Sequence, residues 1–111
     1  MNVNFNGYGE NVATFIADST LTQTGVPVKI SADGTVKACA TGENFCGICV
    51  GIRDGYAAVQ LAGYVKVSTT AKLALGYTKV AAGASGKVAA NENGRALLVV
   101  DSTTTEAGII L

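Results

Sequence analysis

The sequence predicts an all-β fold, either a small β-sandwich or a partly open β-barrel built from hairpins, with an extended N-terminal arm. Runs rich in Val, Thr and Ile alternate with Gly, Asp and Asn about every eight to twelve residues, the spacing typical of sandwiches and barrels. No stretch carries a sustained 3.6-residue apolar stripe. The most helix-like segment, residues 70–75, ends at Gly76 and is short enough to be a turn of helix or a loop.

The chain of 111 residues has the size of one domain. We expect residues 1–20 to form the arm and residues 21–111 to form a single β domain. The arm is rich in Asn, Gly and Thr, and it has two interpretations. It is a frayed terminus, or it orders only on a partner, with Phe5, Tyr8 and Phe15 as anchors.

A first hairpin is predicted at Asp54 and Gly55, a dipeptide that favours a two-residue type I′ turn. The resulting register pairs apolar residues on one face, namely Ile52 with Ala57, Val50 with Val59, and Ile48 with Leu61. The opposite face is flatter and more polar, and it sets Phe45 against Tyr64. We therefore add Phe45 and Tyr64 to the candidate partner-binding residues.

A second hairpin is predicted to join residues 26–30 to residues 35–38. A three-residue loop with Gly34 in the left-handed conformation pairs Ile30 with Val36 and Val28 with Ala38. Pro27 cannot donate a hydrogen bond to a ladder, so it belongs at a sheet edge or at the start of a strand.

A third hairpin is predicted at Asn93 and Gly94, which sets residues 88–90 against residues 97–99 and places Glu92 near Arg95 as an ion pair. Residues 95–100 are apolar on both faces, which favours a central strand covered by another sheet or by a neighbouring subunit. Residues 25–38 and 76–89 also resemble each other loosely. This echo favours a pseudo-symmetric fold, with chance similarity as the alternative.

Catalytic chemistry has little support in the sequence. The chain has no histidine, which excludes Ser-His-Asp and Cys-His sites. Cys46 and Cys49 form a CxxC pair, but in a strand such positions point to opposite faces, and Cys39 is the one further thiol for zinc. Residues 82–87 lack the spacing of a phosphate-binding loop. We predict no enzyme, no cofactor and no metal site.

Charge and composition limit the partners. The net charge is zero and 14% of residues are charged, which argues against nucleic-acid and membrane binding. The sequence shows no spanning segment and no signal peptide. Three cysteines are an odd number and too few for a secreted disulfide framework. We expect synthesis in a cytosol, with the thiols reduced.

Several runs resemble the short prophage proteins of a domain-of-unknown-function family associated with capsid decoration. The likeness covers about residues 20–111 and includes GVPVK at 25–29, DGTVK at 33–37, CGICVGI at 46–52, YAAVQLAGYVKV at 56–67 and IIL at 109–111. The resemblance implies a β-rich, often trimeric protein that binds the major capsid protein on the virion surface and braces neighbouring capsomers. The glycine-rich start of this chain departs from that family.

A different class of function is the alternative. A small carbohydrate- or ligand-binding module would use Tyr56, Tyr64 and Tyr77 as a stacking platform. The absence of Trp and the aromatic content of 6% count against it.

Overall fold

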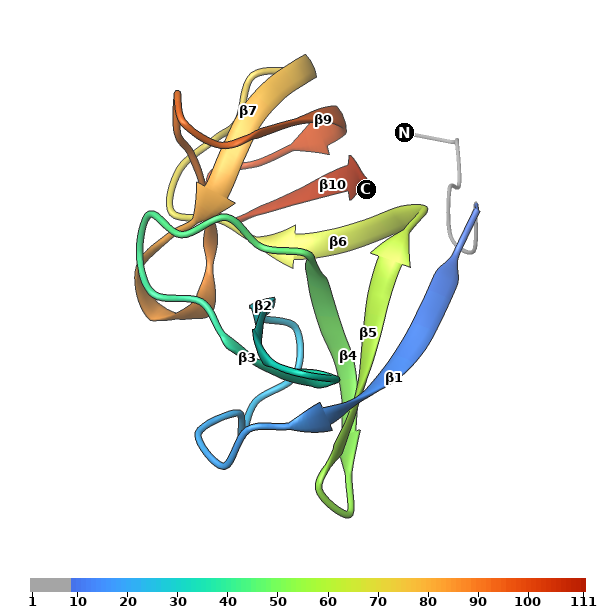
Figure 1. Ribbon diagram of the computed structural model, residues 1–111. Coiled ribbons are helices and arrows are strands. Elements are labelled where there is room, and N and C mark those ends of the chain that lie inside the picture. The colour runs from blue at the N-terminus through green and yellow to red at the C-terminus, as the bar shows by residue number, and fades with distance from the viewer. Residues whose placement is uncertain (1–8) are drawn as a thin grey trace.

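The chain folds into ten short strands and one turn of 3₁₀ helix, as described for residues 9–111 by a computed structural model (Figure 1). The predicted all-β fold is confirmed. Residues 70–75 form a loop. The elements are β1 (Asn11–Ala17), β2 (Pro27–Ala32), β3 (Thr35–Ala38), β4 (Gly47–Arg53), β5 (Tyr56–Ala62), β6 (Tyr64–Ser68), β7 (Gly76–Ala82), η1 (Ala84–Gly86), β8 (Val88–Ala90), β9 (Arg95–Ser102) and β10 (Glu106–Ile110).

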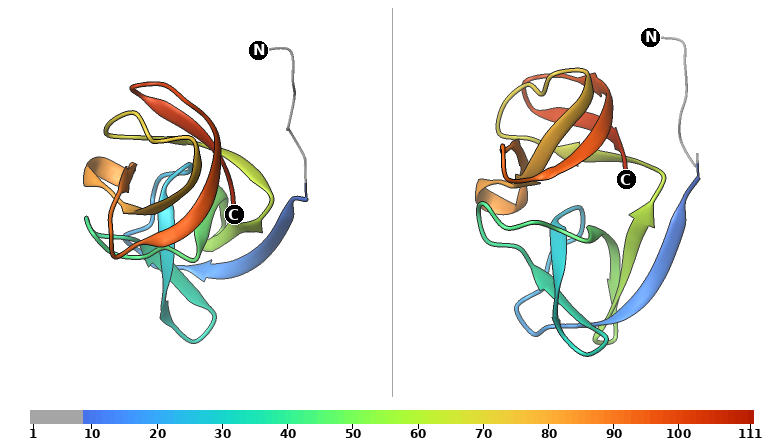
Figure 2. Two further views of the ribbon diagram at one scale, coloured as in Figure 1. Left: turned by 90° about the horizontal axis from the view of Figure 1, so that it is seen from above. Right: turned by 45° about the horizontal axis from the view of Figure 1, so that its top comes forward.

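The strands form two five-stranded units that follow each other along the chain. Strands β1–β5 make a closed barrel in the order β1-β3-β2-β4-β5, and β6–β10 make a sheet in the order β6-β10-β9-β7-β8. A parallel bridge between Thr69 and Val88 connects the two edge strands of this sheet. We call residues 11–62 unit 1 and residues 64–110 unit 2, and Figure 2 shows them as neighbouring bodies.

Unit 2 repeats the strand pairing of unit 1. Replacing β1–β5 by β6–β10 converts each pairing of unit 1 into one of unit 2, including the parallel contact of β1 with β3, whose counterpart is the Thr69–Val88 bridge. The β2–β3 ladder recurs as the β7–β8 ladder, where Val28↔Ala38 and Ile30↔Val36 correspond to Val80↔Ala90 and Ala82↔Val88.

The second hairpin of each unit recurs with the same irregularity. The β4–β5 ladder recurs as the β9–β10 ladder, where Cys49↔Val59 and Gly51↔Ala58 correspond to Val99↔Ile109 and Asp101↔Gly108. Val50 and Val100 are the extra residues of two equivalent β-bulges. The loose echo in the sequence therefore marks a structural repeat, in which the β7–β9 register alone is shifted relative to β2–β4.

The cores repeat as well. The core of unit 2 matches the barrel core, because equivalent residues of equivalent strands point inward in both units. The equivalent buried residues are Leu21 and Leu73, Val28 and Val80, Val36 and Val88, Cys49 and Val99, Ala57 and Ala107, and Val59 and Ile109.

The connection over residues 39–46 links β3 to β4 within unit 1 and packs on unit 2. It is longer than its counterpart between β8 and β9. Gly42 and Glu43 exchange backbone hydrogen bonds with Ala82 of β7, at 2.8 and 2.9 Å. Phe45 enters the unit 2 core, and its carbonyl accepts a hydrogen bond of 3.2 Å from Arg95, whose guanidinium lies 5.9 Å from the Phe45 ring centre.

The Asp54–Gly55 hairpin is confirmed, and both turn residues have positive φ. Its predicted register holds from Arg53↔Tyr56 to Gly51↔Ala58 and is wrong beyond that pair, because the bulge at Val50 shifts every following pair by one. As a result Cys49, and not Val50, lies opposite Val59 and enters the barrel core. Ile48, on the other face of the strand, enters the unit 2 core. Val50 and Leu61, which the predicted register places on the apolar face, are exposed.

The second hairpin has the predicted pairs, with Ser31 as the extra residue and Pro27 at the start of the strand. The third hairpin is wrong, because β7 lies between β8 and β9. Gly94 is required there for a different reason, since a Cβ atom would collide with the backbone of Val80. The prediction of a central strand over residues 95–100 is confirmed, because β9 lies between β10 and β7.

Part of the predicted arm is a barrel strand. Residues 11–17 form β1, which pairs with β5 along its length and with β3 at its end. Exposed and half-buried residues alternate along this segment, as expected of a strand with one face on a core. Phe15 and Ala17 pack on the barrel core. Residues 1–8 of the arm lie outside the described residues.

Candidate interaction surface

The predicted partner-binding residues are not assembled on one surface. Phe45 is buried in the unit 2 core and Tyr64 is 9% exposed, so the predicted flat face carrying this pair is wrong. Phe15 is half-buried against the barrel core. Phe5 and Tyr8 lie outside the described residues.

The tyrosine platform is also not assembled. Tyr64 is buried, whereas Tyr56 lies on β5 of unit 1 and Tyr77 lies on β7 of unit 2. Tyr77 is 80% exposed and borders a hollow of about 430 Å³ with Leu98 and Ile110. A sugar ring could therefore meet at most one of these tyrosines on each unit.

An exposed apolar surface lies on the outer side of β1, β5 and β4, which run side by side in Figure 1. Three strand residues there are about half exposed, namely Val12, Ile16 and Tyr56. Ile16 is opposite Tyr56 in the ladder, so the two side chains form one apolar ridge. We call this surface, made up of Val12, Thr14, Ile16, Gly51, Arg53, Tyr56 and Ala58, the β1–β5–β4 face.

The face is hollowed beside the ridge. A shallow depression of about 290 Å³ is lined by Thr14, Gly51, Ile52, Arg53, Tyr56 and Ala58. Its floor is made by small residues, because Gly51 has no side chain and faces Ala58 across the ladder. A ridge beside a small-residue floor can receive a protruding side chain of a partner.

The face carries one charge. Among the residues of β1, β4 and β5 the only charged side chain is that of Arg53. Arg53 lies 3.7 Å from the carboxylate of its neighbour Asp54, and both side chains are almost fully exposed, at 93% and 87%. Such an exposed pair is weak and leaves the guanidinium available to another acceptor.

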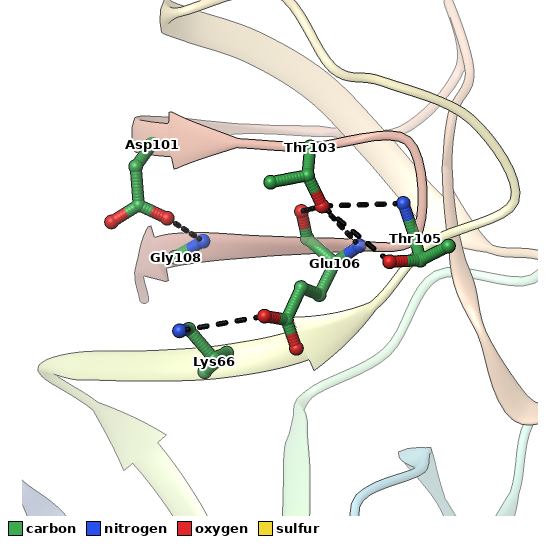
Figure 3. Close-up of polar contacts among 6 residues, drawn as sticks. All are labelled: Lys66, Asp101, Thr103, Thr105, Glu106 and Gly108. Atoms are coloured by element: carbon green, nitrogen blue, oxygen red, sulfur yellow. Dashed lines mark hydrogen bonds and ion pairs between the residues drawn. The ribbon is translucent and has the colours of Figure 1, made fainter.

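The equivalent surface of unit 2 carries polar contacts between its own residues, which Figure 3 shows. Lys66 pairs with Glu106 at 3.6 Å across β6 and β10. The carboxylate of Asp101 accepts a hydrogen bond of 3.1 Å from the N–H of Gly108. The hydroxyl of Thr103 accepts hydrogen bonds from the N–H groups of Thr105 and Glu106, at 3.3 and 3.2 Å.

The three cysteines are free thiols, and all of them are buried or half-buried. Burial raises the pKa of Cys39 to about 11, and burial also raises the pKa values of Cys46 and Cys49. Within residues 9–111, no three His, Cys, Asp or Glu side chains gather where they could hold a metal ion. The same residues include no helix with the length and hydropathy to span a bilayer.

Sequence reasoning missed the β1–β5–β4 face because it assigned residues 11–17 to the arm. The signal was present: Val12, Thr14 and Ile16 alternate with three residues that face the core. The apolar character of Val12 and Ile16 hides the alternation, since both sides of the strand read as hydrophobic.

The protein is thus of an all-β class built from two repeated five-strand units. No family model and no curated protein matches the chain. Among solved structures, it is similar in fold to the crystal structure of the head fiber gp8.5 N base in bacteriophage phi29, with a TM-score of 0.61 over 92% of this chain and 93% of that one. The two sequences are 12% identical, so the likeness concerns the fold.

Proposed function

We propose that this protein is a non-enzymatic structural protein of a phage virion, and that it binds the major capsid protein on the outside of the head as a decoration subunit. The observation that carries the proposal is the fold likeness to the base of a head fiber, which extends over nearly the whole of both chains. An exposed apolar face on a small β domain is consistent with attachment to a larger surface.

The mechanism is stoichiometric binding. A decoration protein stabilises a shell when it binds the expanded lattice more tightly than the unexpanded one, so many weak contacts add up over the head. Assembly as a trimer would place three copies of one face toward symmetry-related capsomers. In this proposal the protein is made in the host cytoplasm and ends on the capsid surface.

The test uses purified protein and heads of the encoding phage from which this protein has been removed. We expect co-sedimentation that saturates at a fixed number of copies per capsomer, and a higher temperature of head disruption. Sedimentation velocity of the free protein measures whether it is a trimer. Absence of head binding, together with binding to a glycan array, would replace the proposal by the sugar-binding alternative.

A further inference from the structure

The repeat provides an internal comparison for the β1–β5–β4 face. Each residue that lines its hollow has a structural counterpart in unit 2, found at the equivalent position of the equivalent ladder. The counterparts of Thr14, Gly51, Arg53, Tyr56 and Ala58 are Lys66, Asp101, Thr103, Glu106 and Gly108. These five residues of unit 2 are all drawn in Figure 3.

The two copies differ in what fills the position over the bulge. In unit 2 the Asp101 carboxylate lies there and accepts a hydrogen bond from the Gly108 N–H. In unit 1 the counterpart of Asp101 is Gly51, which brings no side chain, and Ala58 takes the place of Gly108. The position that holds a carboxylate in one unit is thus part of an open hollow in the other.

The charges of the two faces also differ in sign and number. The strands β6, β9 and β10 carry Lys66, Arg95, Asp101 and Glu106, so cations and anions are balanced. The corresponding strands of unit 1 carry Arg53 alone. The guanidinium of Arg53, which has only a weak exposed pair with Asp54, lies beside the hollow and can bind a carboxylate supplied by another molecule.

We propose that the β1–β5–β4 face is the surface that docks on the phage head, and that its partner is a protein segment carrying an acidic side chain next to an apolar one. The inference rests on the proposed function and names the partner of that attachment. The partner carboxylate takes the place over Gly51 that Asp101 fills in unit 2, within reach of Arg53. The adjacent apolar side chain packs on the ridge of Ile16 and Tyr56.

The main test rebuilds the unit 2 arrangement in unit 1. Gly51→Asp adds the carboxylate found at Asp101, and the backbone tolerates it, because a Cβ at Gly51 meets only the Cβ of Ala58, at 3.9 Å. The variant should fold as the wild type does and bind undecorated heads roughly tenfold or more weakly, because its own carboxylate occupies the hollow and repels the acidic partner. Circular dichroism and the thermal midpoint check folding.

A charge-matched pair gives a second, independent test. Arg53→Glu reverses the charge of the face, whereas Lys79→Glu makes the same change at an exposed residue of β7 in unit 2. We expect Arg53→Glu to weaken binding to undecorated heads by about tenfold or more, and Lys79→Glu to leave it within about twofold. Wild-type binding should also weaken with added salt.

The outcomes separate this inference from the proposed function. If the wild type fails to bind heads, the proposed function is wrong. If the wild type binds heads and both Gly51→Asp and Arg53→Glu bind equally well, decoration stands and the docking surface lies elsewhere. If Gly51→Asp instead dissociates an oligomer of the free protein, the occupant is a second copy of this chain and the inference is overturned.

Discussion

Val50 and Val100 are the extra residues of two β-bulges that occupy the same place in successive copies of one hairpin. In unit 1 the extra residue sets which side chain of β4 faces the barrel core, because Cys49 rather than Val50 lies opposite Val59. Ile48, the neighbour of Cys49, points to the opposite face of the strand and is buried in the unit 2 core. The bulge therefore determines which residues of β4 are buried.

Gly94→Ala should destabilise the fold through a steric clash. A Cβ at Gly94 would overlap the backbone of Val80 in β7, which cannot move without disturbing the sheet. Overpacking of this kind costs about 1–3 kcal/mol or more. Urea unfolding measures the loss, with Gly51→Ala as the control, because its Cβ would make only an ordinary van der Waals contact with Ala58, at 3.9 Å. Equal stability of the two variants would contradict the close approach of Gly94 to β7.

Val28→Ala and Val80→Ala remove equivalent core side chains from the two units. Both valines are fully buried, so each change should cost about 2 kcal/mol from lost burial and the cavity left behind. Because Phe45 and Ile48 tie the cores together, we expect each variant to unfold in one transition observed alike by fluorescence and circular dichroism. Two separate transitions would show that the units unfold independently.

Glu43 should contribute to stability at neutral pH and lose that contribution in acid. The Lys29 ammonium donates to its carboxylate and the Ala40 N–H donates at 2.7 Å, which together lower the pKa of Glu43 below its usual 4.5. The contribution is complete above about pH 4.5 and disappears as the pH falls through the lower pKa of the folded state.

Urea midpoints between pH 7 and pH 3 measure this dependence. Glu43→Gln should reduce the acid-induced fall in stability, whereas Glu92→Gln, at an exposed turn residue, should leave the fall unchanged. Part of the fall should remain in Glu43→Gln, because hydrogen bonds from Thr20 also lower the pKa of Asp18. An unchanged fall in Glu43→Gln would mean that the Lys29–Glu43 contact does not form in solution.

Cys39 should react slowly with thiol reagents in the folded protein. Burial raises its pKa to about 11, so at pH 8 the nucleophilic thiolate is scarce. Iodoacetamide labelling followed by mass spectrometry should show slow modification at pH 8, a rise in rate toward pH 11, and rapid modification in urea at either pH. Fast labelling of the native protein at pH 8 would indicate an exposed thiol.

The sequence was most informative where a turn has strong local chemistry. Asp54-Gly55 and Gly34 specify their turns by positive φ, so both hairpins could be predicted. Asn93-Gly94 has the same local pattern, yet Gly94 is selected by its contact with Val80, a residue distant in sequence. The insertion of β7 between β8 and β9 could not be seen from local pairing rules, because both alternatives bury apolar faces.

The candidate site was predicted less well than the fold. Phe45 and Tyr64 were assigned to the surface because a regular ladder from Asp54-Gly55 places them on the polar side, and the bulge at Val50 invalidates that register. The β1–β5–β4 face depends on three strands and on the absence of a side chain at Gly51. The hollow at Gly51 is recognised as a site for a carboxylate only by comparison with Asp101, and that comparison requires the strand pairing of both units.

The connection over residues 39–46 prevents the two units from being separated into independent fragments. The strand plan occurs twice, yet Phe45 and Ile48 belong by sequence to the first copy and by packing to the second. A fragment starting at residue 64 would carry five complete strands and still lack two of its core side chains. A protease cut in this one connection, which severs no strand, would accordingly loosen both halves of the protein.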